Sequence, residues 1–339
     1  MLHELKEIIQ KAIINQNKGI KNVLVTVVDL DGSSYRKPGV RMLISNNNSY
    51  IGAVSGGCVE KEIIRRAQSV FTDNKAKVIT YDGRYRLGCE GILYILIEPF
   101  IITDSFLHSF LFALENRETV NINSYFKKQD EAIGNYGSII TFKNTEQFTL
   151  SNSLSIETLN NETVFTQNLK PLFKLLIIGG EHDAVKLCKI ASNLGWEIDV
   201  ITAAKDSKLK SDFPGASAVY GETPETIQFN NIEEDTAIVL MNHSYVQDLK
   251  YLVQLSKHTP KYIGILGAPN RREKLFNALF DFAPETTEEF LDIVYTPAGL
   301  HIGAKTPEEI AISIIAEILS VIRKKESFSL RELQGKIDN

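Results

Sequence analysis

Cysteine is scarce in this sequence. The 339 residues include only three, Cys58, Cys89 and Cys188. Three thiols are too few for a disulfide framework, and their spacing does not match that of a zinc finger. The sequence therefore names no metal ligand set, and we expect any functional cysteine to act as a reduced thiol.

Long hydrophobic runs are also missing. The longest conspicuous run, from Ile92 to Ile97, ends at Glu98 and Pro99, whereas a membrane helix needs about 20 apolar residues. The segment from Met1 to Glu7 is charged and amphipathic, unlike the apolar stretch of a secretory signal. We therefore expect a cytoplasmic protein without a membrane span.

Neither sign of charge dominates. The chain has 37 basic and 42 acidic side chains, a formal net charge of −5, and 43% hydrophobic residues. Proteins that bind nucleic acids concentrate positive charge, so no nucleic-acid partner is expected. The composition is that of a globular protein, and the length suggests two domains at roughly 150 residues each.

The first half begins with a helical pattern and continues as strands. Apolar residues at helical spacing predict a helix over 5–14, and a β-branched run predicts a strand over 23–28. Four further segments are typical of strands, the first two forming a hairpin: 41–44, 49–54, 77–81 and 91–97. Residues 105–168 combine one helix-like segment with short polar strands.

The second half alternates strands and helices. A buried strand over 174–178 runs into two glycines and then into a helix over 182–194. Further short apolar strands, over 198–202, 237–241 and 262–266, are separated by helical patterns, as in a parallel α/β sheet. A capping box at 306–309, with proline at the first helical position, predicts the final helix. We predict two domains, 1–168 and 171–325.

The first candidate site is the junction Ser55-Gly56-Gly57-Cys58-Val59-Glu60, which leads from a strand into a helix. N–H groups at a helix N-terminus bind anions and lower the pKa of a nearby thiol. Cys58 is then either a reactive thiolate or a small buried residue at a tight turn. The same alternatives hold for Cys89 in its glycine-flanked loop. Cys188, on the apolar face of a helix, is expected in the core.

The second candidate site follows the first strand of the second half. Gly179, Gly180 and His182 stand where a dinucleotide fingerprint should lie, but Glu181 takes the position of the second glycine. The segment where an acid would bind a ribose reads Ile201 to Ala204. The sequence therefore predicts weak NAD(P) binding, and the alternative is a Rossmann-like sheet that only packs. His243 also follows a predicted strand, and His301 lies beside glycines. Lone histidines are usually structural.

Several segments taken together carry a family resemblance. In the first half they are Gly32 to Gly39 with Arg41 and Met42, Gly52 to Glu60, and Gly88 to Gly91. In the second half they are Tyr262 to Gly267, Pro297 to Ala304, and Thr306 to Glu317. With these segments the chain resembles the XdhC/CoxI family, the accessory factors for xanthine dehydrogenase and related molybdenum hydroxylases.

The resemblance implies an α/β protein with an N-terminal XdhC-type domain and a Rossmann-like parallel-sheet domain. It implies a factor that binds molybdenum cofactor, assists its sulfuration and delivers it to a xanthine dehydrogenase-type hydroxylase. Such a protein is a cofactor chaperone rather than a catalyst; the alternative is an NAD(P)-dependent oxidoreductase. The implied partners are the hydroxylase client and a cysteine desulfurase, and base rates favour a homodimer.

The resemblance also implies which residues form the sites, none of them catalytic. The predicted cofactor pocket comprises Arg41, Ser55, Gly56, Gly57, Cys58, Glu60 and Cys89, and the nucleotide crevice comprises Gly179, Gly180 and His182. The chain departs from the family pattern at Glu90, at Gly180-Glu181 and at Thr202, which stands for an acidic residue. Two of these departures fall on the nucleotide crevice, so we expect altered nucleotide contact beside an intact first-domain site.

Overall fold

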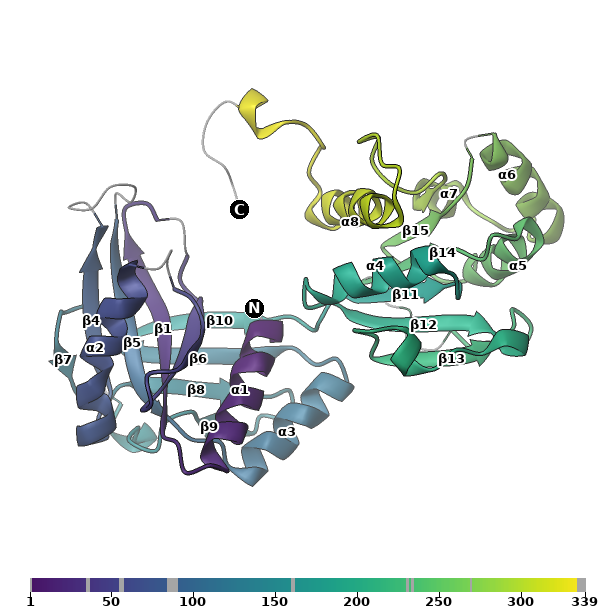
Figure 1. Cartoon of the computed structure of the whole chain (residues 1–339). Coiled ribbons are helices and arrows are strands. Elements are labelled where there is room, and N and C mark those ends of the chain that lie inside the picture. Colours follow the sequence, from purple (N-terminus) through teal and green to yellow (C-terminus); the bar gives the residue numbers. More distant parts are fainter. Residues whose placement is uncertain are drawn as a thin grey trace. The chain divides into compact units, whose positions relative to one another are not determined.

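The computed structural model describes residues 2–34, 37–54, 58–83, 91–159, 162–229, 232, 235–268 and 270–333. The chain folds into two compact units, Met1–Leu172 and Phe173–Asn339 (Figure 1). None of the described helices is long and apolar enough to cross a membrane.

The first unit contains two antiparallel sheets. The larger has six strands in the order β3-β2-β1-β5-β4-β7. Its strands are β1 (Asn22–Asp31), β2 (Arg41–Ser45), β3 (Tyr50–Gly52), β4 (Lys77–Asp82), β5 (Ile92–Phe100) and β7 (Ala132–Ile133). The smaller sheet has the order β10-β6-β8-β9. Its strands are β6 (Val120–Phe126), β8 (Gly137–Thr141), β9 (Gln147–Thr149) and β10 (Thr163–Leu169).

Both faces of the larger sheet are covered, which explains why β1 is buried along most of its length. Helix α2 (Cys58–Asp73) covers one face, where Val25 and Met42 lie. Helices α1 (Leu2–Gln16) and α3 (Asp104–Glu115) share a core with Leu24 and Leu43 on the other face, together with the smaller sheet. Side chains of a strand point alternately to its two faces, so neighbouring residues enter different cores.

The second unit is a parallel sheet with helices on both faces. Its strands are β11 (Lys174–Ile178), β12 (Glu197–Ala203), β13 (Ala218–Glu222), β14 (Thr236–Leu240), β15 (Tyr262–Ile265) and β16 (Val294–Tyr295). The order β13-β12-β11-β14-β15-β16 is that of a Rossmann fold. The predicted fold class is therefore confirmed.

The helices of the second unit differ in which face they cover. Helices α4 (His182–Ser192) and α8 (Pro307–Arg323) pack on one face, where Cys188 is buried as predicted. Helices α5 (Tyr245–Leu255), α6 (Arg271–Phe282) and α7 (Glu288–Asp292) pack on the other. The predicted capping box of α8 is present between Thr306 and Glu309. Short 3-10 turns are η2 (Ile156–Thr158), η3 (Ala204–Asp206), η4 (Lys210–Asp212) and η5 (Leu330–Glu332).

Candidate functional site

The motif-bearing segments of the first unit adjoin strands that end at the same end of its larger sheet. Antiparallel pairing places Asp31, the last residue of β1, opposite Ile92, the first residue of β5. The start of β2 and the end of β3 pair at the same end, and α2 begins soon after β3. The segments 32–39, 52–60 and 88–91 therefore all leave from this end of the sheet.

Two of these segments touch through their backbones. A Cβ added to Gly91 would lie 2.6 Å from the Ser33 carbonyl oxygen and 2.9 Å from that of Asp31. Such distances exclude any side chain, because only glycine leaves the backbone free to approach so closely. Gly91 is thus required for the chain just before β5 to pack against the residues that follow β1.

The predicted thiol lies where α2 starts. The helix begins at Cys58, and Glu60, in its first turn, is 3% exposed. Val59 and Ile63 of this helix are buried against the sheet, and their packing fixes the position of the first turn. Ser55, Gly56, Gly57, Cys89 and the side chain of Cys58 lie outside the described residues, so the assignments of this pocket stay predictions. The first turn nonetheless places the positive end of a long helix at the motif-bearing end of the sheet.

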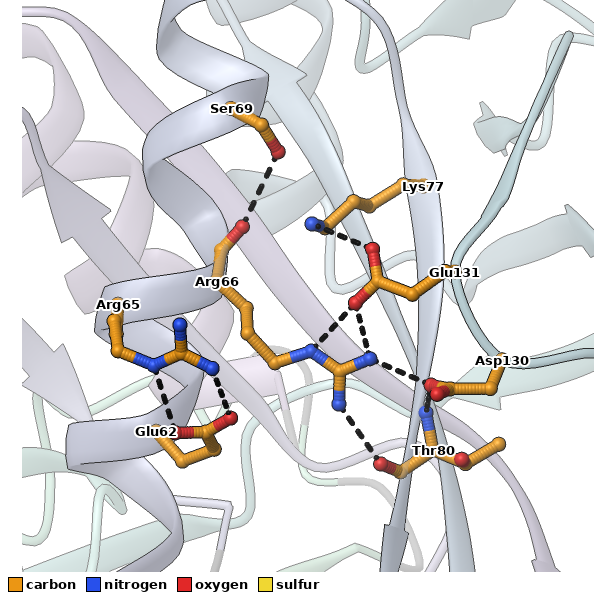
Figure 2. A network of polar contacts seen from close by, with 8 residues as sticks. All are labelled: Glu62, Arg65, Arg66, Ser69, Lys77, Thr80, Asp130 and Glu131. Carbon is orange, nitrogen blue, oxygen red and sulfur yellow. Dashed lines mark hydrogen bonds and ion pairs between the residues drawn. The ribbon is translucent and has the colours of Figure 1, made fainter.

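A polar network holds α2 against β4 and the turn before β7 (Figure 2). Arg66 of α2 donates to the Thr80 carbonyl at 3.1 Å, pairs with Asp130 at 2.6 Å, and also pairs with Glu131. The second carboxylate oxygen of Glu131 accepts from Lys77 at 3.1 Å. The guanidinium therefore joins three segments and restrains the helix that carries Cys58.

The Arg41 guanidinium lies away from α2. Leu43 packs with α1 and Met42 with α2, so Arg41 shares the face of Leu43. It is 4% exposed, and its Nη1 donates to the Gly39 carbonyl at 3.1 Å and to Gln167 Oε1 at 2.5 Å. Its Nε and Nη2 are buried without a hydrogen-bond partner among the described residues. The structure thus does not bring this guanidinium to the start of α2.

A buried carboxylate lies on the same face of the sheet. The sequence predicts that the strand ends before Glu98, but β5 continues to Phe100 and Glu98 is 0% exposed. Its two oxygens accept hydrogen bonds from the Ser138 backbone N–H at 2.8 Å and hydroxyl at 2.6 Å. Burial raises the pKa of Glu98 to about 7 and lowers the pKa of Arg41 to about 10. Sequence patterns missed this group because its hydrogen-bond donor comes from a distant strand.

A charged cluster at the motif-bearing end of the sheet was also missed. Lys128 Nζ lies 2.6 Å from an oxygen of Asp31 and 3.0 Å from one of Asp29, and the Tyr94 hydroxyl donates to Asp31 at 3.0 Å. The hydrogen bond from Lys128 lowers the pKa of Asp31, and its bonds to both carboxylates raise the pKa of Lys128. Lys128 belongs to the region 105–168, which contributes little to the family resemblance.

In the second unit, the predicted nucleotide crevice is shaped by Gly179 and Thr202. Gly179 has a φ of +152°, and a Cβ there would lie 2.5 Å from the Met241 carbonyl oxygen. Glu181 is the N-cap of α4 without a side-chain capping bond, and His182 after it is exposed. The Thr202 hydroxyl donates to the Tyr220 carbonyl at 3.2 Å and accepts from the Lys208 N–H at 3.2 Å. Thr202 is thus engaged inside the fold where an acid would bind a ribose.

One of the lone histidines, His243, lies at this crevice. His243 Nε2 is 3.8 Å from an oxygen of Asp183, between the ends of β14 and β11 where the strand order reverses. His301 is exposed in the loop after β16, which is held by Glu317 accepting from the Gly299 N–H at 2.8 Å. No cluster of three or more His, Cys, Asp or Glu side chains among the described residues could hold a metal ion.

An arginine at the same edge is already paired. Arg271, the first residue of α6, donates to Asp248 Oδ2 at 2.8 Å and to the Leu266 carbonyl at 3.2 Å. Asp248 is 0% exposed and also accepts from Asn242 at 2.9 Å. These bonds commit the guanidinium to the fold, so it does not serve as a ready phosphate site.

The fold and its motif-bearing ends define a protein with an N-terminal two-sheet unit and a C-terminal Rossmann unit. Residues 16–82 match the XdhC and CoxI family, and residues 175–318 match the XdhC Rossmann domain. The chain belongs to the XdhC and CoxI family, as the sequence motifs predicted.

Several known proteins are similar along nearly the whole chain. A probable xanthine dehydrogenase subunit from Bacillus subtilis is 29% identical over 322 residues, covering 89% of this chain and 93% of the relative. The molybdenum cofactor insertion chaperone PaoD from Escherichia coli is 24% identical over 315 residues, covering 91% and 85%. The crystal structure of a xanthine dehydrogenase from Bacillus halodurans matches with a TM-score of 0.75 at 26% identity, covering 94% of this chain and 96% of that one.

Proposed function

We propose that this protein binds molybdenum cofactor as cargo and assists its insertion into a xanthine dehydrogenase-type molybdenum hydroxylase. The observation that carries the proposal is the start of α2 at Cys58, near the sheet end from which the motif-bearing segments leave. The names of the relatives from Bacillus subtilis and Escherichia coli, similar over most of this chain, agree with it. The role is that of a chaperone, without a catalytic residue of its own.

The chemistry of the cargo suits this end of the first unit. Molybdopterin carries a phosphate, which the N–H groups and positive dipole of a helix N-terminus attract. It also holds its metal through sulfur, a setting in which a neighbouring thiol can act as a ligand or as a sulfur carrier. In this proposal Cys58 contacts the terminal ligand of the metal, and a cysteine desulfurase supplies the sulfur.

Two residues of the second unit disfavour the NAD(P)-dependent alternative. Glu181 adds bulk and negative charge where a pyrophosphate would approach the backbone. Thr202 offers a hydroxyl that already donates to the Tyr220 carbonyl. Neither feature favours a dinucleotide in this crevice.

Retention of cofactor tests the proposal. The full chain would be mixed with released molybdenum cofactor, passed through gel filtration, and assayed for molybdenum and pterin. We expect both to co-elute with the native chain but not with Cys58→Ala. Cys188→Ala is the matched control, because Cys188 is 0% exposed in the core of the second unit.

The two outcomes against the proposal are distinct. Full retention by Cys58→Ala removes the site assignment while leaving the chaperone role. A native chain that retains neither molybdenum nor pterin removes the chaperone role itself.

A further inference from the structure

A cavity of about 460 Å³ opens at the end of the first unit's larger sheet that lies opposite its motif-bearing end. Antiparallel pairing joins Asn22, the first residue of β1, to Phe100, the last residue of β5, and both residues line the cavity. The last turn of α2 contributes to its wall. The volume falls in the range of small-molecule pockets, about 300 to 1,000 Å³, so the cavity has room for a ligand.

Most of the surface of this cavity is apolar. Val23 of β1 and Val70 of α2 are 1% and 2% exposed, and Pro99, which pairs with Val23, is buried. Phe71 is half-buried, and Ile101 is 43% exposed. Because the rings of Phe71 and Pro99 present flat surfaces, the cavity suits a flat apolar ring.

Two asparagines add a polar pair to this surface. Asn74, which follows α2, donates from its Nδ2 to Asn152 Oδ1 at 3.3 Å, and both residues line the cavity. The donating amide keeps its oxygen and the accepting amide keeps its NH₂ group, and neither group bonds to another described residue. Reversing both amides leaves the same two kinds of group free. The cavity therefore offers one hydrogen-bond acceptor beside one donor.

The other side-chain amides that line the cavity are committed to the fold. Gln16 bonds through its oxygen and its nitrogen to the backbone of Ile102. Asn22 donates to the Ala12 carbonyl and accepts from Asn15. Only the pair of Asn74 and Asn152 is thus left to recognise a polar edge.

An acceptor beside a donor recognises an amide whose N–H and carbonyl lie on one edge. A trans peptide bond has these groups on opposite edges, so a polypeptide backbone does not fit. The amide of a lactam is held cis by its ring, which places the N–H and the carbonyl side by side. Oxopurines and related flat heterocycles contain such an edge.

The charges around the cavity favour an uncharged ligand that donates an N–H. Lys21 is the one charged residue that lines it, so no carboxylate is present to attract a cation. Asn74 follows the last turn of α2, where the negative end of the helix dipole favours hydrogen-bond donors. We propose that this cavity binds a flat two-ring lactam, whose N–H and carbonyl bond to the free oxygen and the free NH₂ group of Asn74 and Asn152.

This ligand is not the cargo of the proposed function. Helix α2 has 16 residues, from Cys58 to Asp73, and such a helix is about 24 Å long. The cavity lies at its end, whereas the thiol lies at its start. The inference therefore goes beyond the proposed function and does not depend on it.

Titration calorimetry of the full chain with carbostyril, a two-ring lactam, tests the inference. We expect binding at one site. N-methylcarbostyril should bind about fivefold weaker or worse, because it has no N–H for the asparagine oxygen. Nicotinamide has the same amide edge outside its ring and only one ring, so it should also bind more weakly.

Variants of the cavity locate the site. Asn74→Gly and Asn152→Ala should each weaken carbostyril binding about fivefold, because one hydrogen bond is lost. Asn74 has a φ of +50°, which glycine also adopts, and both asparagines are exposed, so these variants should fold. Ile101→Ala removes apolar contact from the wall and should also weaken binding. The matched control is Asn168→Ala, an exposed asparagine of β10 outside the cavity, which should bind normally.

Three results overturn the inference. They are no binding of carbostyril, equal binding of N-methylcarbostyril, and unchanged binding in both asparagine variants. Tighter binding of nicotinamide than of carbostyril overturns the choice of a ring lactam in favour of a primary carboxamide. Retention of cofactor and binding of carbostyril are separate measurements, so the failure of one leaves the other standing.

Discussion

Each unit has an arginine near a buried carboxylate, and the two pairs are built differently. In the second unit Arg271 donates directly to Asp248 at 2.8 Å. In the first unit Arg41 and Glu98 are 4% and 0% exposed, but Arg41 donates to Gly39 and Gln167. The Glu98 carboxylate instead accepts from Ser138.

The difference shows which charge is compensated. A buried charge is costly unless a partner and hydrogen bonds offset its loss of hydration. Asp248 has two donors, whereas Arg41 keeps two nitrogens without a partner among the described residues. The pKa of Glu98, about 7, and that of Arg41, about 10, are both moved towards the neutral form by burial. The first unit therefore contains a less compensated pair than the second.

The largest expected effect comes from breaking the direct pair. Arg271→Met should lower the free energy of unfolding of the second unit by about 3 to 5 kcal/mol, because Asp248 stays buried without its cation. Urea unfolding followed by Trp196 fluorescence measures this, since Trp196 is the only tryptophan and packs against Phe173 at 4.8 Å. Arg272→Met, an exposed neighbour, is the control. A loss below about 1 kcal/mol would show that Arg271 offsets the burial of Asp248 no better than Arg41 offsets the burial of Glu98.

The next effect is a pH dependence of the first unit. Burial raises the pKa of Glu98 from 4.5 to about 7, so the folded state binds its proton more tightly than the unfolded state. The resulting stabilisation is complete below pH 4.5 and is lost as the pH rises through about 7, on the order of 3 kcal/mol in total.

Urea unfolding followed by far-UV circular dichroism at pH 5 and pH 8 would measure this loss. The unfolding of the first unit is the transition that Trp196 fluorescence does not follow, because Trp196 lies in the second unit. Glu98→Gln keeps a neutral, hydrogen-bonding side chain, so most of the pH dependence between these values should disappear. An equal pH dependence in native chain and variant would assign it to other groups.

A smaller effect is expected from removing the less compensated cation. Arg41→Met should change the free energy of unfolding by no more than about 1 kcal/mol, because the lost hydrogen bonds are offset by the desolvation that a guanidinium no longer incurs. It should also raise the pKa of Glu98 further, since the charge of Arg41 lowers it. The same urea experiment over a pH series measures both. A cost equal to that of Arg271→Met would erase the contrast between the two pairs.

The smallest effect concerns an exposed pair of the same chemistry. The Arg65 side chain is 72% exposed where it pairs with Glu62 at 2.7 Å. Water screens such a pair, so Glu62→Ala should leave the unfolding midpoint of the first unit unchanged within error. A clear shift would mean that exposure does not decide how much these ion pairs contribute to stability.

Much of the fold follows from local patterns. The capping box from Thr306 to Glu309 and the apolar stripe after it predicted α8, and the structure confirms its start. The strand and glycines at 174–180 predicted the first Rossmann element, and Cys188 is in the core as its helical position indicated. These features depend on neighbours a few residues away, which a sequence displays directly.

The sequence by itself determined the α/β class, the Rossmann element and the motifs that identify the family. Tertiary structure alone decided that Glu98 lies inside a strand covered on both faces, because its donor Ser138 is 40 residues away. It also decided that Arg41 turns from α2 towards Gln167, 126 residues away. Periodicity shows which side chains share a face, but the groups opposite that face are set by long-range packing.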